Sequence, residues 1–180
     1  MDLAVAMRIT CTATATKTAD MSGTPTSSSI FTLSDTLADG TAVDQADIVY
    51  FDSNTLIADA TESYDLSGAL TDVYGDTITA ARVKFLGLKN TSSTASVLKL
   101  GGGTGDDGTN AFDTWIVSCT GTTANLGSEG VLVRPGGMFA LWAPDATAYA
   151  VTAATADILM VQEMSTLAAA YDLMVIMATA

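Results

Sequence analysis

The apolar positions of this chain fall into short runs or alternate with polar ones. In the last third, apolar runs recur at intervals of about ten residues and are separated by Pro, Gly and Asp. This spacing is typical of strands in a β-sandwich or barrel. The runs are Val131–Arg134, Met138–Trp142, Tyr149–Val151, Ile158–Val161 and Leu173–Ile176. The pattern therefore predicts an all-β fold.

The N-terminal segment alternates with period two. Apolar side chains occupy the odd positions from Leu3 to Ala13, and Arg8 and threonines lie between them. Alternation over this length predicts a long strand with one buried face. Residues 20–29 then break the pattern with Ser, Thr, Gly and Pro. We expect residues 20–40 to form a flexible loop or irregular arm that could order on a neighbour, within a single domain over residues 1–180.

The middle of the chain predicts further strands, for a total of about ten. Residues 163–177 could also form a helix, but the spacing of Tyr171, Leu173 and Val175 favours a strand. Val83 and Phe85 share one face of a predicted strand and Leu86 and Leu88 the other, which indicates a bulge or burial on both sides. The remaining expected strands are 47–51, 55–58, 97–100 and 115–117, with a turn at Asp52–Asn54 between the first two.

The charge of the chain is strongly acidic. There are 20 acidic and 7 basic residues, a formal net charge of −13. Nucleic acid is not an expected partner, because phosphate binding needs clustered Lys and Arg. The start of the chain lacks the basic residues of a secretion signal, and no apolar run reaches the ~18 residues that cross a bilayer. We therefore expect a soluble protein with no membrane partner.

No motif in the sequence predicts catalysis, a cofactor or a metal. The chain has no histidine, so a Ser or Cys nucleophile would lack its usual base. The glycine-rich stretch 101–108 lacks the Lys-Ser/Thr pair of a phosphate-binding loop. Asp106, Asp107 and Asp113 could approach a calcium ion, but their spacing matches no calcium-binding loop. We expect a protein that is not an enzyme.

The two cysteines and three aromatic residues have competing interpretations. Cys11 and Cys119 lie in apolar runs and are expected to be buried small side chains, with a disulfide as the alternative. Trp115, Phe139 and Trp142 lie within expected strands. They are expected to belong to the core, whereas a sugar-binding platform would need them exposed.

Four of the seven cations lie within a short stretch: Arg82, Lys84, Lys89 and Lys99. Arg82 and Lys84 would point to the same side of one strand. One interpretation is a solvated strand face. The other is a positive patch that contacts an acidic surface on a neighbouring copy or another partner, where complementary charge fixes the register.

Several patterns from Tyr64 onward carry a resemblance to a known class of protein. They are Tyr64–Leu66 with Gly75, Val83–Asn90, Leu100–Gly102, Val133–Phe139, Tyr149–Thr152, Ala156–Leu159 and Tyr171–Ile176. In these strand and turn patterns the chain resembles small virion structural proteins of tailed bacteriophages.

The resemblance implies a jelly-roll-like antiparallel β-sandwich that acts as a capsid decoration, or cement, protein. Such a protein would lie on the virion exterior and bind the major capsid protein and other copies of itself, as a trimer or dimer. The alternative is a tail or fibre-tip module that binds a host receptor or glycan. A free carbohydrate-binding module is a third possibility, but it would usually carry an export signal.

Overall fold

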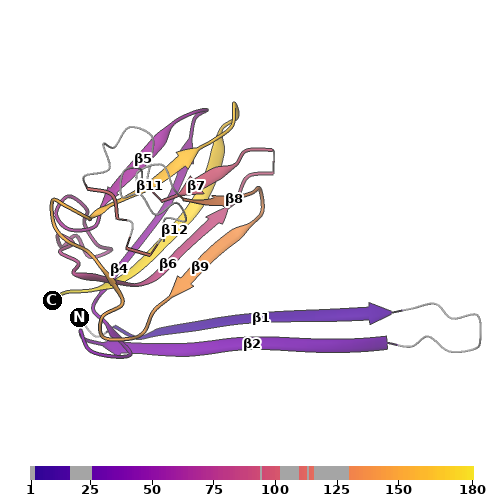
Figure 1. Ribbon diagram of the computed structural model, residues 1–180, viewed down its shortest axis with the longest axis horizontal. Helices are drawn as coiled ribbons and strands as arrows, with labels where there is room; N and C mark the ends of the chain where they lie inside the picture. Colours follow the sequence, from indigo (N-terminus) through magenta and orange to yellow (C-terminus); the bar gives the residue numbers. More distant parts are fainter. Residues whose placement is uncertain (1–2, 17–25, 94, 102–109, 113, 116–129) are drawn as a thin grey trace, which may run out of the picture.

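The computed structural model describes residues 3–16, 26–93, 95–101, 110–112, 114–115 and 130–180. Those residues form twelve strands and no helix. The predicted all-β sandwich is therefore confirmed. Figure 1 shows a sandwich body and a long two-stranded arm that leaves the body at one end.

The body contains two antiparallel sheets. The first sheet has the order β4-β12-β6-β9, and the two-residue strand β10 (Tyr149–Ala150) extends it beside the start of β6. Its four main strands are β4 (Ile48–Leu56), β12 (Ala169–Ala178), β6 (Arg82–Asn90) and β9 (Met138–Trp142). The second sheet has the order β5-β11-β7-β8. Its strands are β5 (Thr61–Asp65), β11 (Ile158–Glu163), β7 (Leu98–Leu100) and β8 (Val131–Val133).

The path of the chain between the two sheets is that of a jelly roll. Among the eight main strands of the described body, each strand lies in the other sheet from the one before it in the chain. The exception is β8, which follows β7 in the second sheet. This alternation folds two Greek keys over each other, so strands distant in sequence become neighbours. The C-terminal strand β12 consequently lies between β4 and β6 at the centre of the first sheet.

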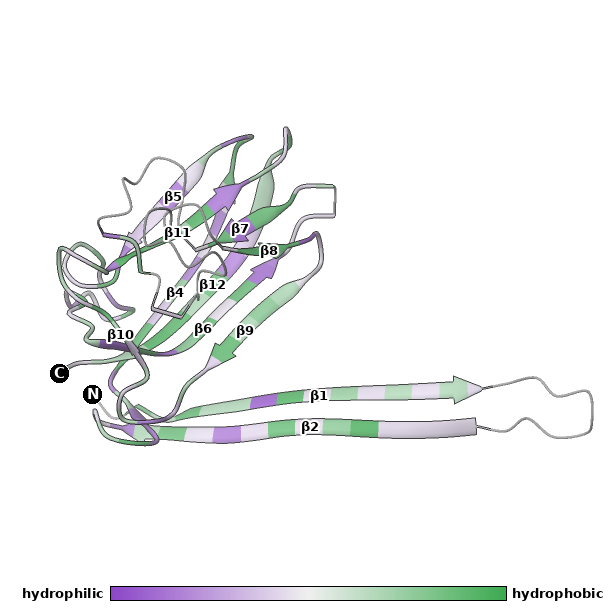
Figure 2. Cartoon of the chain, in the orientation of Figure 1, coloured by the Kyte–Doolittle hydropathy of each residue, from purple (hydrophilic) through white to green (hydrophobic). Residues whose placement is uncertain are grey.

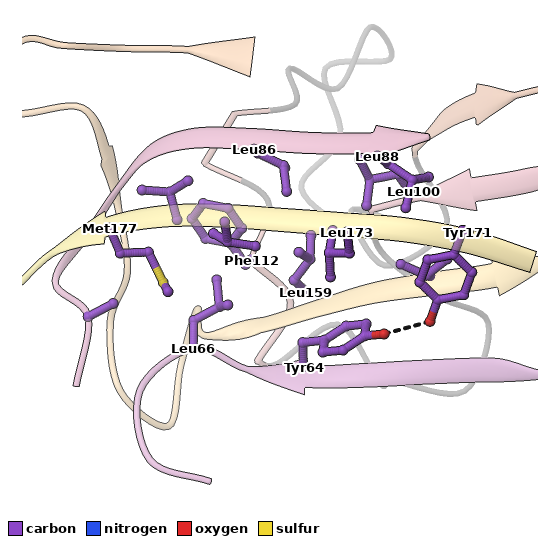
Figure 3. Packing of buried hydrophobic residues seen from close by; sticks show 14 of the residues in the cluster. Tyr64, Leu66, Leu86, Leu88, Leu100, Phe112, Leu159, Tyr171, Leu173 and Met177 are labelled. Carbon is purple, nitrogen blue, oxygen red and sulfur yellow. Dashed lines mark hydrogen bonds between the residues drawn. The ribbon is translucent and has the colours of Figure 1, made fainter. Parts of the chain in front are cut away.

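The core lies between the two sheets. Tyr171, Leu173 and Val175 of β12 are all buried and face Tyr64 and Leu159 of the second sheet (Figure 3). The alternation that favoured a strand over a helix for this segment is confirmed. Successive residues of a strand point to opposite faces, so alternate residues of β12 all point into the core.

The arm is a hairpin of β1 (Val5–Thr16) and β2 (Thr26–Asp39), and the two-residue strand β3 (Gln45–Ala46) pairs in parallel with the end of β2. The two strands pair without a break from Val5 opposite Leu37 to Thr16 opposite Thr26. Residues 20–40 were expected to form a flexible loop or irregular arm; the loop is wrong for residues 26–39, which form a regular strand of an arm. Residues 17–25 lie outside the described part. The Ser- and Thr-rich segment forms a strand because β1 offers a long partner edge and because Thr is favourable in sheets.

The first sheet contradicts one prediction and confirms another. The expected turn at Asp52–Asn54 is wrong, because β4 runs without interruption and pairs with β12 through these residues. Their polar side chains instead bond to other strands: the hydroxyl of Ser53 donates to Asp172 at 2.7 Å. The bulge expected in β6 is confirmed, because Phe85 pairs with Ile176 while Val83 pairs with Met177, which leaves Lys84 as the extra residue. The expectation that Val83 and Phe85 share a face is wrong, because Val83 lies in the core with Leu86 and Leu88 while Phe85 lies on the outer face of the sheet.

Candidate interaction surface

The arm has one apolar and one polar face. Opposite residues of an antiparallel pair point to the same side, so the register of β1 and β2 defines both faces. We call the apolar side the arm face. Its cross-strand pairs are Val5–Leu37, Met7–Asp35, Ile9–Leu33, Cys11–Phe31, Ala13–Ser29 and Ala15–Ser27. The other side carries mostly Thr and Ser, with Ile30 as an apolar exception (Figure 2 shows the mixture along both strands).

The base of the arm is anchored to the body by a second hydrophobic cluster. Leu37 is buried there with Ile176, and Val5 packs beside them. The indole N–H of Trp142 donates to the Asp35 carboxylate at 2.8 Å. The cluster lies on the outer side of the first sheet, because Ile176 alternates with the core residues of β12.

Further along, the arm face has no cover. Ile9, Leu33 and Phe31 are 39%, 47% and 60% exposed. The prediction of a strand with one buried face is therefore right about the strand and wrong about the burial in a single chain. Cys11 is exposed on the same face and is a free cysteine, which corrects the expectation that it is buried. Cys119 lies outside the described residues.

The outer face of the first sheet is also apolar. The register places three cross-strand rows on it: Val49–Ile176–Phe85–Trp142, Phe51–Met174–Gly87–Ala140 and Ser53–Asp172–Lys89–Met138. The arm base covers the first row. The second row and Met138 line a shallow groove of about 180 Å³. Phe51 and Met174 are 49% and 38% exposed, and we call this surface the sheet groove.

Gly87 shapes the sheet groove. A Cβ atom at this position would lie 2.7 Å from the Phe85 ring, so a larger residue would force the ring to move. The Phe85 ring packs edge-on against Trp142, with ring centroids 6.0 Å apart. The floor of the groove is therefore held by the same aromatic pair that supports the base of the arm.

The structure does not bring the four cations together as an exposed patch. Lys84 is fully buried, and its amine donates to the carbonyls of Ala42, Pro144 and Asp145. Arg82 is half-buried and donates to the carbonyls of Thr41 and Ala146, at 2.8 and 3.1 Å. These two cations fasten the loop after the arm to the loop after β9, because the β6 bulge points Lys84 toward both.

Burial lowers the pKa of the Lys84 amine, and the nearby charge of Arg82 lowers it further. The acidic Asp145 and Asp44 oppose that shift. Hydrogen bonds from Thr147 and from the Ala148 amide hold the pKa of the exposed Asp145 carboxyl at about 2. The buried Lys84 amine therefore holds the two loops from beneath, through its hydrogen bonds to the carbonyls of Ala42, Pro144 and Asp145.

The other two cations differ from each other. Lys99 is buried at 6% exposure in β7, so the expectation of a solvated strand face is wrong for Lys84 and Lys99. Lys89 is exposed and lies opposite Asp172 in the third row of the sheet face. A role for these cations in contacting a partner stays a prediction.

The aromatic residues support the body. Trp115 and Phe139 pack against the main core with ring centroids 5.4 Å apart, and Trp142 packs in the second cluster. All three therefore pack against a hydrophobic core, as expected, although each is only partly buried. The strand expected at residues 115–117 is not seen at Trp115, which lies in a turn, and residues 116–117 are outside the described part.

A buried polar cluster lies between the two sheets. The Tyr64 hydroxyl is 2.6 Å from the Tyr171 hydroxyl and donates to the Asp52 carboxylate at 2.7 Å. Burial raises the pKa of Tyr171 to about 12, and burial with these hydrogen bonds raises that of Tyr64 still further. Both hydroxyls stay protonated at neutral pH, so the cluster supports packing between the sheets rather than acid–base chemistry.

No described part of the molecule forms a metal site or a membrane span. Among the residues that can be described, no three potential ligands gather around one point. Asp106, Asp107 and Asp113 lie outside the described residues. Within the described ranges, no helix is long and apolar enough to cross a membrane. An open pocket of about 480 Å³ is lined by Asp47, Asp72, Tyr74 and Asp76 among others.

No protein-family model, curated protein or solved structure matches this chain. A function for the chain therefore has to be inferred from its fold and from these surfaces. The sheet groove was not predicted from the sequence, although a signal was present. Leu173–Met177 is apolar at every position, and such a run provides two apolar faces, as in a strand covered on both sides.

Proposed function

We propose that this protein is a non-enzymatic virion structural protein that decorates and stabilises a capsid shell. The observation that carries the proposal is the combination of a jelly-roll body with a projecting arm whose apolar face is uncovered. Jelly rolls occur in viral capsid and lectin domains, so the fold supports this function only by analogy. The exposed apolar arm supports it independently, because uncovered apolar surface of this kind marks a contact site.

The acidic charge fits the same role. A net charge of −13 favours solubility and disfavours non-specific aggregation before the protein meets a shell. An apolar arm can still bind where a receiving surface covers it, because the gain from burying apolar area does not depend on charge. On this proposal the partners are the major capsid protein and other copies of the chain, at the capsid exterior.

Immunogold negative-stain imaging of virions from the source of this chain tests the proposal. Gold distributed over the shell is the expected result. Gold confined to the tail would instead support a tail or fibre-tip module, and particles without label would contradict both. As a second readout, shells lacking the protein should lose their DNA at lower temperature than complete shells, and adding the purified protein back should restore their stability.

One observation favours the tail-module alternative. Tyr74 is 71% exposed at the rim of the 480 Å³ pocket, and an exposed aromatic ring beside polar side chains is the arrangement that stacks on a sugar. A glycan array distinguishes the two functions. Binding that is lost in Tyr74→Ala would support the tail module, and no binding by the native protein would remove it.

A further inference from the structure

The arm face and the sheet groove are two apolar surfaces on one chain that do not cover each other. They meet at the second hydrophobic cluster, where Leu37 of the arm packs on the first row of the sheet. Beyond that cluster, Phe31 of the arm and Phe51 of the sheet remain 60% and 49% exposed. The arm therefore extends away from its own sheet, as Figure 1 shows, and both surfaces are available to another molecule.

We propose that the occupant of the sheet groove is the arm of a second copy, and that two copies exchange arms reciprocally. In such a pair each copy inserts its arm face against the other's sheet groove, which is the self-complementary arrangement of a two-fold dimer. The inference goes beyond the proposed function, because it holds or fails with the oligomeric state whether or not the protein binds a capsid.

Charge favours contact through these surfaces. Two copies that each carry a net charge of −13 repel each other, so they can approach closely only where acidic residues are scarce. Asp35 is the only acidic residue in the described pairs of the arm face, and it accepts the Trp142 hydrogen bond. In the three described rows of the sheet face, Asp172 is the only acid and lies opposite Lys89.

The contact area is sufficient for a stable dimer. The uncovered part of the arm is about 30 Å long and about 10 Å wide, from the usual rise per residue and spacing of strands. Two reciprocal contacts of that size bury about 1,200 Å² in total, at the lower end of specific interfaces. A single one-way contact would bury about half of that, so the reciprocal arrangement is the stable one.

The mass of the full chain in solution, measured by sedimentation over a range of concentrations, tests the exchange. The native protein is expected to be a dimer. Phe31→Asp on the arm face and Phe51→Asp in the sheet groove should each shift it to a monomer, weakening association at least tenfold. Ile30→Asp is the matched control: Ile30 neighbours Phe31 and is more exposed, at 71%, but lies on the opposite face of the arm. It should leave the dimer intact.

A complementation experiment separates arm exchange from other dimers. Phe31→Lys and Phe51→Asp, each monomeric alone, should form a mixed dimer when combined, because one arm-to-groove contact stays native and the other pairs opposite charges. Circular dichroism of each variant checks that it is folded. A native monomer or trimer would overturn the proposal, as would a Phe51→Asp variant that remains a dimer, which would mean that arms pack on arms.

Discussion

The sandwich and the arm are built from strands with the same alternation of apolar and polar residues, but they differ in how far the apolar side chains are buried. In the body, Leu173 and Leu159 face each other from two sheets of one chain and are fully buried. In the arm, Ile9 and Leu33 share one face, and only the base of that face meets the body. Alternation thus specifies an amphipathic strand, while the fold decides whether its apolar face is covered within the same molecule.

The largest expected effect is on the free energy of unfolding, which should fall much more for a substitution in the body than for one in the arm. Leu173→Ala should lower the free energy of unfolding by about 2–5 kcal/mol, because it leaves a cavity in the core. Leu33→Ala on the arm face should change it by no more than about 0.5 kcal/mol, because the side chain is already partly in water. Urea unfolding at concentrations where the protein is monomeric measures both. Equal losses would show that the arm is part of the cooperative core.

Alkaline pH should weaken the body through its buried tyrosines. The folded pKa of Tyr171 is raised to about 12 and that of Tyr64 further, above the unfolded value near 10. Their stabilising contribution is therefore present below pH 10 and is lost as the pH rises from 10 toward 12. In this range the free energy of unfolding should fall by about 1.4 kcal/mol per pH unit for each tyrosine that keeps its proton in the folded state and loses it on unfolding.

Urea unfolding at pH 8, 10 and 11 measures this loss. In Tyr64→Phe the free energy of unfolding should fall less steeply with pH, because one of the two protonated hydroxyls is gone. Tyr74→Phe removes an exposed tyrosine outside the core and serves as the control, with the decline unchanged. A stability that stays constant up to pH 11 would contradict the role of this cluster.

The junction between body and arm should respond to loss of the Lys84 amine. Lys84→Met keeps much of the buried stem but leaves the carbonyls of Ala42 and Asp145 without this donor. The expected cost is about 1–3 kcal/mol. Lys89→Met, at an exposed position of the same strand, should have little effect. Thermal unfolding of both variants gives the comparison, and the prediction fails if the two melting temperatures agree.

A smaller change should loosen the arm and leave the body intact. Trp142→Phe removes the hydrogen bond to Asp35 and should cost about 1 kcal/mol. Amide hydrogen exchange should become faster at the base of β1 and β2, while β12 keeps its protection. Trp115→Phe, whose indole N–H bonds to Phe112 within the body, should not change exchange in the arm. Faster exchange in β12 of Trp142→Phe would indicate that arm and body unfold together.

Much of the body could be predicted because its signals are local. The runs at Met138–Trp142 and Ile158–Val161 became strands β9 and β11, bounded by the expected Pro, Gly and Asp residues. The turn that was wrongly predicted at Asp52–Asn54 shows the limit of such signals. Asp and Asn favour turns through bonds to their own backbone, but here Asp52 accepts a hydrogen bond from Tyr64 of the opposite sheet.

The candidate surfaces were harder to predict. Lys84 resembles a surface cation in the sequence because lysine is rarely buried, and only the bulge in β6 turns it toward carbonyls contributed by two distant loops. The sheet groove combines Phe51, Gly87 and Met174 from three strands that are neighbours only through the jelly-roll order. No spacing along the chain records that arrangement.

The sequence by itself determined that this protein is made of strands, that it is strongly acidic, and that its N-terminal segment has one apolar face, because composition and periodicity are properties of the chain. The tertiary structure decided that β12 is central and buried while β1 projects and leaves Ile9 and Cys11 exposed. The physical reason is that burial requires a second surface, and which surface a strand meets depends on long-range pairing rather than on its own residues.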